Sequence, residues 1–175
     1  MKKLISLLLA LTMVAAMAAG CNNGASNKTP IADNMETVAN TIIEKNPVEF
    51  MGGILPVDLA DTSEDGLWAI THNTGLQNAE KLSDIAVYES MMGSIAFSMV
   101  LVRVNDAADA KTVAQEMSDN IDTCKWVCVG ADEKITVGYC DVVMLIMLDS
   151  SLGLTAQSFV DAFQTVCGDE LDFTI

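Results

Sequence analysis

The sequence has few of the residues that carry chemistry at enzyme sites. Among its 175 residues there is one histidine, His72, and aromatic residues make up 5% of the chain. The hydrolase patterns Gly-x-Ser-x-Gly and His-Glu-x-x-His do not occur in it. A hydrolase would need a nucleophile and a carboxylate folded beside His72, and no motif places them there. We therefore expect no catalytic residues, and the chain is predicted not to be an enzyme.

Basic residues are also scarce. The chain has 9 lysines and arginines against 24 aspartates and glutamates, a net charge of −15. Nucleic acids and anionic lipid surfaces repel a chain of this charge, so binding of nucleic acid is excluded. Cationic peptides, metal ions and neutral ligands remain possible partners, and the charge alone also keeps a protein soluble outside a cell.

Long apolar runs are missing except at the N-terminus. Met1-Lys2-Lys3 is basic, the stretch from Leu4 to Met17 is almost wholly apolar, and Ala18-Ala19-Gly20 is a run of small residues. This is the layout of a secretory signal. The apolar run is shorter than the roughly 18–20 residues of a membrane-spanning helix. We therefore expect residues 1–20 to be a signal peptide and not a retained anchor.

The small residues lead directly into Cys21. Ala18-Ala19-Gly20-Cys21 resembles a bacterial lipobox, in which cleavage precedes a cysteine that carries the lipid; Ala18 departs from the leucine that this pattern prefers. Cleavage by an ordinary signal peptidase is the alternative. Residues 22–30 are small and polar, as in a flexible tether. We predict lipidation of Cys21, a tether over 21–30, and a protein held on the outer face of the membrane of a Gram-positive cell.

Processing at Cys21 would leave 155 residues. Only Lys2 and Lys3 among the charged residues are removed, so 7 basic and 24 acidic residues remain, a net charge of −17. A chain of this length buries enough surface for one self-sufficient core. Residues 31–175 are therefore predicted to form one domain.

The first part of that domain is expected to be mainly helical, over 31–92. Apolar residues at three- and four-residue spacing predict a helix over 31–45, and capping residues at 62–65 predict the start of a second. A third helix is expected from about Asn78 to Met91. The stretch 48–59 contains Gly and Pro and is expected to be a loop with a short extended piece.

The second part, 93–175, has the order β-α-β-β-α. Strands are predicted over 94–104, 134–137 and 141–148, helices over 107–123 and 156–166, and a last edge strand over 171–175. Gly138-Tyr139-Cys140 is expected to form the hairpin between the second and third strands. The predicted fold class is α+β: a mainly antiparallel sheet with helices packed on one face, ferredoxin-like in its C-terminal half.

Two stretches carry a resemblance to known proteins. The leader, "SIAFSMVLVRVNDAADAKTVAQEM" and "KITVGYCDVVMLIML" together resemble small uncharacterised lipoproteins, a domain of unknown function, from gut clostridia and other Firmicutes. The resemblance covers the leader and roughly residues 94–148. It implies a lipoprotein with a strand, helix and glycine hairpin, and it brings no catalytic residues.

Four cysteines remain after Cys21: Cys124, Cys128, Cys140 and Cys167. Their spacing matches no zinc module. Three disulfide pairings are possible and the sequence does not choose among them, although Cys128 with Cys140 or Cys167 is one option. A redox pair needs Cys-x-x-Cys at a helix N-terminus, whereas Cys124 and Cys128 are one residue too far apart and follow a helix. Buried free thiols are the preferred interpretation.

The stretch Asp61–Gly66 imitates the start of a calcium loop. Oxygen-bearing side chains stand at Asp61, Ser63 and Asp65, and Gly66 occupies the sixth position. The twelfth position, which needs glutamate, is His72. A capped helix start at Thr62 or Ser63 explains the same residues, so we expect no metal site and no cofactor, and leave calcium as an open alternative.

The aromatic residues are expected to be core or hairpin residues, and the methionines are expected to fill the core. This prediction covers Trp68, Trp126, Tyr88 and Tyr139, and the methionines Met91, Met92, Met99, Met144 and Met147. What remains is a membrane-anchored extracytoplasmic lipoprotein, expected to be a binding or interaction module for a protein or a small molecule. A structural or accessory envelope protein is the alternative, and a hydrolase or thiol-redox enzyme ranks behind both.

Overall fold

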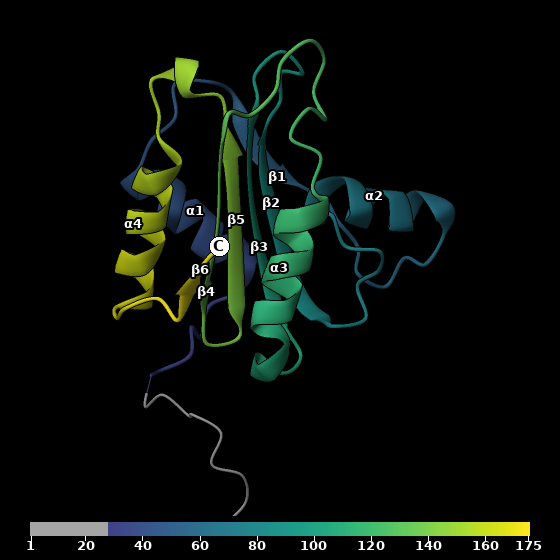
Figure 1. Cartoon of the computed structure of the whole chain (residues 1–175), viewed down its shortest axis with the longest axis vertical. Coiled ribbons are helices and arrows are strands. Elements are labelled where there is room, and N and C mark those ends of the chain that lie inside the picture. The colour runs from purple at the N-terminus through teal and green to yellow at the C-terminus, as the bar shows by residue number, and fades with distance from the viewer. Residues whose placement is uncertain (1–27) are drawn as a thin grey trace, which may run out of the picture.

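Six strands form one open antiparallel sheet in the computed structural model, which describes residues 28–175 (Figure 1). Residues 1–27, with the predicted leader and Cys21, lie outside the described part. The strand order across the sheet is β1-β2-β3-β5-β4-β6. The strands are β1 Gly52–Leu55, β2 Leu82–Ser90, β3 Phe97–Val104, β4 Glu133–Tyr139, β5 Val142–Leu148 and β6 Phe173–Thr174.

Helices cover both faces of this sheet. Figure 1 shows the sheet almost edge-on, with α1 (Met35–Lys45) and α4 (Ala156–Cys167) on one side. On the other side lie α3 (Ala110–Asn120) and, further out, α2 (Glu64–Thr74). The side chains form two apolar clusters, one between the sheet and α1 and α4, the other between the sheet and α3, to which α2 contributes Ile70.

The predicted α+β class with an antiparallel sheet is confirmed, but the helices are not confined to one face. The reason lies in the central strands. All seven residues of β5 are buried, and its apolar run has no polar alternation that could face water. A strand of this kind needs cover on both sides, which α4 and α3 supply.

The predicted helix from Asn78 to Met91 is wrong, because this stretch forms β2. Alternate residues of β2 face opposite sides: Ala86 and Tyr88 join the α1/α4 cluster, while Val87 joins the α3 cluster. The strand pairs with β1 on one side and β3 on the other. The β-branched and aromatic residues of this stretch favour a strand, and pairing on both edges stabilises it. The helical spacing of its apolar residues is too weak to compete. Residues 31–92 therefore hold two helices and two strands and are not mainly helical.

The order β-α-β-β-α-β from Ser94 onward is confirmed, including the last short strand. Strand β5 lies between β3 and β4 and is antiparallel to both, which is a split βαβ arrangement. The half is not a complete ferredoxin-like layer, because α3 and α4 lie on opposite faces and β6 pairs with β4 at the sheet edge.

The turn of the β4–β5 hairpin lies closer to β5 than the predicted turn at Gly138-Tyr139-Cys140. Tyr139 pairs with Val142, so the loop is Cys140-Asp141, and Cys140 has the positive φ of 52°. Gly138 lies within β4, where an added Cβ would stand 2.1 Å from the Phe173 ring of β6. The glycine is needed for the close approach of β6 and not for the turn.

The strand register defines two ends of the sheet. At one end, which we call the cap end, Phe97 pairs with Leu148 and Leu148 with Glu133. At the opposite end Tyr139 pairs with Val142, and Lys28 lies beside this turn; we call it the Lys28 end. In Figure 1 the cap end is at the top, and the described chain begins at the bottom. None of the helices described in residues 28–175 has the length and apolar character needed to cross a membrane.

Candidate functional site

Four exposed apolar side chains gather at the cap end. They are Met51, Met91, Met92 and Val127, with 74%, 53%, 50% and 70% of their surface exposed. We call these four residues the apolar cap. The other large apolar side chains exposed in residues 28–175 are Leu67 and Trp68 on α2. Clustered exposure of this kind is a feature of interaction surfaces, whereas single exposed apolar residues are ordinary.

Backbone hydrogen bonds hold the cap residues together. Met51 stands just before β1 and Met91 just after β2, and the Met91 N–H donates to the Met51 carbonyl at 2.9 Å. The Val127 N–H donates to the Gly93 carbonyl, also at 2.9 Å. Three segments far apart in the sequence thus meet at the cap. The β2–β3 connection is bonded to the segment of Met51 and to the segment of Val127.

Beneath the cap lies a buried ion pair. Lys125 Nζ is 2.8 Å from Glu89 Oε1, and the lysine side chain is 1% exposed. The ammonium also lies 3.3 Å from Ser98 Oγ and 3.4 Å from Asn73 Oδ1. Glu89 and Ser98 are partners in the β2–β3 register on the α3 side of the sheet. The pair therefore fastens the loop 121–132 to the end of the sheet.

Burial dominates the electrostatics of this lysine. Removal from water lowers the pKa of Lys125 below its usual value, and the Glu89 carboxylate opposes this shift by attraction and by a hydrogen bond. The Lys125 ammonium also lies 5.5 Å from the centre of the Trp126 ring. Burial of the charged ammonium costs free energy, and the Glu89 carboxylate and the neighbouring polar groups offset this cost.

The segments that carry the cap present acidic groups to solvent. Glu49, Asp122 and Asp132 are exposed in the stretches 46–51, 91–96 and 121–132. The basic residue of these stretches is Lys125, which is buried against Glu89. Exposed Lys45 and Lys134 flank these stretches, but together with Glu44 the exposed acidic residues outnumber the exposed lysines, so the charge around the apolar cap is mainly negative.

His72 lies close to this site, where Lys125, Glu89 and Asp122 all act on it electrostatically. Its ring stacks on Trp68 with 4.5 Å between ring centres and 16° between planes. Burial lowers the pKa of His72, and the nearby positive charge of Lys125 lowers it further. Trp68 is 63% exposed, so the expectation that it is a core or hairpin residue is wrong. The stack gives α2 a flat surface formed by the indole and imidazole rings.

The four cysteines of the described residues divide between the two ends. Cys124 and Cys128 are exposed in the loop 121–132, while Cys140 and Cys167 are half-buried at the Lys28 end. All four are free thiols, and the expectation of buried thiols is wrong for the first two. The seven residues of β4 separate Cys128 from Cys140 by about 20 Å, so a bond between them is excluded.

The half-buried thiols are poor nucleophiles. Burial raises the pKa of Cys167 to about 12, and the neighbouring Cys140 adds to the shift. Burial also raises the pKa of Cys140, with contributions from Asp172 and Asp141. Neither thiol has the lowered pKa that a redox-active cysteine needs.

Asp61–Gly66 forms a helix start. Asp61 Oδ1 accepts from the Ser63 N–H at 2.9 Å, and Ser63 Oγ accepts from the Gly66 N–H at 3.2 Å at the beginning of α2. The bonds from Ser63 lower the pKa of Asp61. The carboxylate thus serves the turn and the cap. Throughout residues 28–175, no three His, Cys, Asp or Glu side chains are grouped to hold a metal ion.

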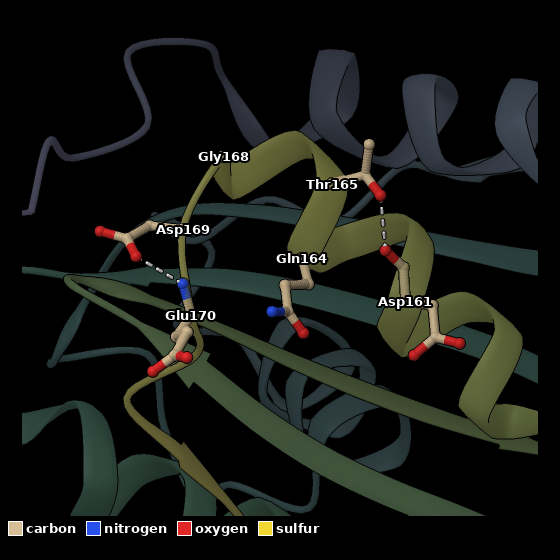
Figure 2. Close-up of a pocket in the computed structure, with 6 residues that line it drawn as sticks. All are labelled: Asp161, Gln164, Thr165, Gly168, Asp169 and Glu170. Atoms are coloured by element: carbon tan, nitrogen blue, oxygen red, sulfur yellow. Dashed lines mark hydrogen bonds between the residues drawn. The ribbon is translucent and has the colours of Figure 1, made fainter.

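A shallow hollow at the C-terminal part of α4 carries three carboxylates (Figure 2). Its lining residues are Asp161, Gln164, Thr165, Gly168, Asp169 and Glu170. Figure 2 shows these side chains spread apart, with Thr165 bonded to the Asp161 carbonyl and the Glu170 N–H bonded to Asp169. The acidic residues are exposed and converge on no common point, so the hollow is a solvated surface.

The sequence prediction missed the central feature of the site. Met99, Met144, Met147 and Tyr139 are almost completely buried as predicted, and Tyr88 is buried with 8% of its surface exposed. Met91 and Met92 were expected in the core but project from the β2–β3 connection. The signal that could have located them is Gly93-Ser94 directly after the pair, which is typical of a turn between two strands.

Comparison with known proteins adds no relative to this description. No protein-family model matches the chain, and neither a curated protein nor a solved structure matches it significantly.

Proposed function

We propose that this chain is an extracytoplasmic lipoprotein, anchored by a lipid on Cys21 to the outer face of a Gram-positive cell membrane, that acts as a binding module. The observation that carries the binding role is the apolar cap, with Met51, Met91, Met92 and Val127 exposed together at one end of the sheet. The anchor rests on the sequence of residues 1–30. The resemblance to clostridial lipoproteins supports the same assignment.

The position of the cap suits a protein tethered through its N-terminus. Lys28 lies at one end of the sheet and the cap at the other, and β4 alone extends over seven residues, or about 20 Å, between them. A flexible tether that joins the domain at Lys28 attaches it at the end opposite the cap, so the cap can face away from the membrane. An interaction surface in that place is open to partners outside the cell.

A photo-crosslinking residue placed at Met92 tests the binding role in the native host. We expect a crosslinked partner from this position and none from Thr165, an exposed position on α4 that serves as the matched control. A structural or accessory envelope protein that does not use the cap would give no adduct at Met92, or equal adducts at both positions.

The substitution Cys21→Ser tests the anchor separately. We expect the altered protein to leave the membrane fraction and to lose the mass of the lipid. Unchanged mass and unchanged membrane association would show that Cys21 carries no lipid.

A further inference from the structure

We propose that the apolar cap binds a cationic amphipathic segment of a partner protein. The inference rests on the binding role proposed above and adds the chemistry of the partner. It is carried by three properties of the cap: the adaptable side chains, the negative surroundings and the fixed backbone.

Methionine makes up most of the cap. Met51, Met91 and Met92 are unbranched side chains with three rotatable bonds, and each is at least half exposed. Exposed methionines adapt their shape to different apolar partners and are used in this way on protein surfaces that receive amphipathic helices. The apolar face of a partner helix is thus the kind of surface that the cap accommodates.

Charge complementarity decides between possible occupants. Glu49, Asp122 and Asp132 are exposed in the segments that carry the cap, and the lysine of those segments is buried against Glu89. Exposed Lys45 and Lys134 flank the segments, and with Glu44 the exposed acidic residues remain in the majority. The whole chain adds 24 acidic against 9 basic residues. Lysine and arginine beside the apolar face of a partner would be attracted at distances up to the Debye length, about 8–10 Å.

The same charges disfavour two other occupants. A second copy of this chain would bring an equal excess of negative charge to the interface, and an anionic lipid surface would be repelled in the same way. An acidic or neutral helix could use the apolar contact but would gain nothing from the surrounding carboxylates.

The backbone of the cap is already ordered. The bonds from Met91 to Met51 and from Val127 to Gly93 join the segments, and the Lys125–Glu89 pair holds the loop down. A partner therefore meets a fixed frame with mobile side-chain ends, which reduces the entropy that binding must overcome.

The test uses the full-length protein in nanodiscs of neutral lipid and three synthetic helical peptides of about 18 residues. The first alternates leucine and lysine with helical periodicity, the second replaces lysine with glutamate, and the third replaces leucine with serine. Methyl-¹³C resonances of Met51, Met91 and Met92 report binding at the cap, and empty nanodiscs correct for peptide bound to lipid.

We expect the leucine–lysine peptide to shift these resonances and to bind at least tenfold more tightly than either of the others. The double substitution Met91→Ser and Met92→Ser should weaken that binding at least tenfold. Leu67→Ser, an exposed apolar position on α2, is the matched control and should leave it unchanged. Raising the salt concentration should weaken binding of the leucine–lysine peptide.

Several results would overturn the inference. Equal binding of the leucine–glutamate peptide would remove the charge requirement, and equal binding of the serine–lysine peptide would remove the apolar one. Self-association that depends on Met91 and Met92 would identify a second copy as the occupant. Shifts of the same resonances on anionic vesicles would identify a membrane surface.

The crosslinking experiment separates this inference from the proposed function. An adduct at Met92 with a partner that has no basic amphipathic segment leaves the binding role intact and refutes the inference about charge. Absence of an adduct at Met92 refutes the binding role itself, whatever the peptides do.

Discussion

The cap end and the Lys28 end of the sheet differ in which side chains they expose to solvent. At the Lys28 end, Asp172 accepts hydrogen bonds from Lys28 Nζ at 2.7 Å and from the Cys140 N–H at 2.6 Å. The Tyr139 hydroxyl donates to the Thr29 carbonyl at 3.0 Å. Polar groups there are paired with other parts of the chain. At the cap end the polar pair is buried and the apolar side chains face solvent.

This difference separates structural residues from residues available for binding. Paired polar groups near Lys28 stabilise the junction of the first and last described segments. The side chains of Met51, Met91 and Met92 are at least half exposed, and the proposed binding role would account for this exposed apolar surface. The predictions below test each side of this contrast, starting with the largest effect.

Breaking the ion pair beneath the cap should have the largest effect on stability. In Lys125→Met, the buried Glu89 carboxylate loses its partner, and we expect the free energy of unfolding to fall by about 3–5 kcal/mol. Urea denaturation measures the change. The double variant Lys125→Met with Glu89→Gln removes both charges and should recover at least half of the loss. A loss below about 1 kcal/mol in the single variant would show that the pair does not hold the loop.

The thiols should differ in reactivity between the two ends. Cys124 and Cys128 are exposed to solvent, whereas Cys167 is half-buried and has a pKa of about 12. The reaction is compared at pH 8. The thiolate fraction of Cys167 is about three orders of magnitude below that of an ordinary cysteine, and its higher intrinsic nucleophilicity recovers only part of this. We expect Cys140 and Cys167 to react with iodoacetamide roughly tenfold to hundredfold more slowly, measured by peptide mass spectrometry. Equal rates at all four cysteines would contradict the burial of the second pair.

Asp172→Ala should destabilise the Lys28 end moderately. The change removes the acceptor of two hydrogen bonds, from Lys28 and from Cys140, in a half-exposed position. We expect a loss of about 1–2 kcal/mol by urea denaturation. Asp169→Ala is the matched control, because its exposed carboxylate bonds only the next residue's N–H among the contacts described, and it should change stability by less than about 0.5 kcal/mol. Equal effects of the two substitutions would remove the special role of Asp172.

His72 should give the smallest effect, seen as pH dependence. Its pKa is lowered in the folded protein, so the unfolded chain binds the proton more readily between that value and the ordinary pKa of 6.5. The contribution of neutral His72 to the free energy of unfolding is therefore present above pH 6.5 and is lost as the pH falls below 6.5. Thermal unfolding followed from pH 7.5 to 5.5 should show a smaller decline for His72→Gln than for the unaltered protein. Parallel curves would mean that burial and Lys125 do not lower the pKa of His72 in the folded protein.

Much of the fold could be predicted because local signals agreed with the packing. Ser63 caps α2, Asp106 caps the turn that leads into α3, and Gly168 ends α4 with φ of 73°, all as their residue types predict. The strands predicted over 94–104 and 141–148 correspond to β3 and β5. In each case a short stretch of sequence determines its own conformation.

The parts that failed depend on contacts with other segments of the chain. Strand β2 is a strand because β1 and β3 pair with both of its edges, and its own residues also allow a helix. The wrong prediction that Met91 and Met92 are buried follows from that error, because a helix ending at Met91 would place the pair against the core. The burial of Lys125 could not be predicted either, because Glu89 and Ser98 come to it from β2 and β3.

The attachment of the chain beside Lys28 also has a mechanical consequence. A pull on the chain ahead of Lys28 passes first to Asp172 and to Tyr139, through the bonds of Lys28 and Thr29. Asp172 directly precedes β6, which is held to β4 by two residue pairs, Val137 with Thr174 and Gly138 with Phe173. Backbone bonds between Ile175 and Thr136 add to this pairing, so under force the contacts of Lys28 and Thr29 would break before β6 leaves the sheet, and the distant cap would keep its shape.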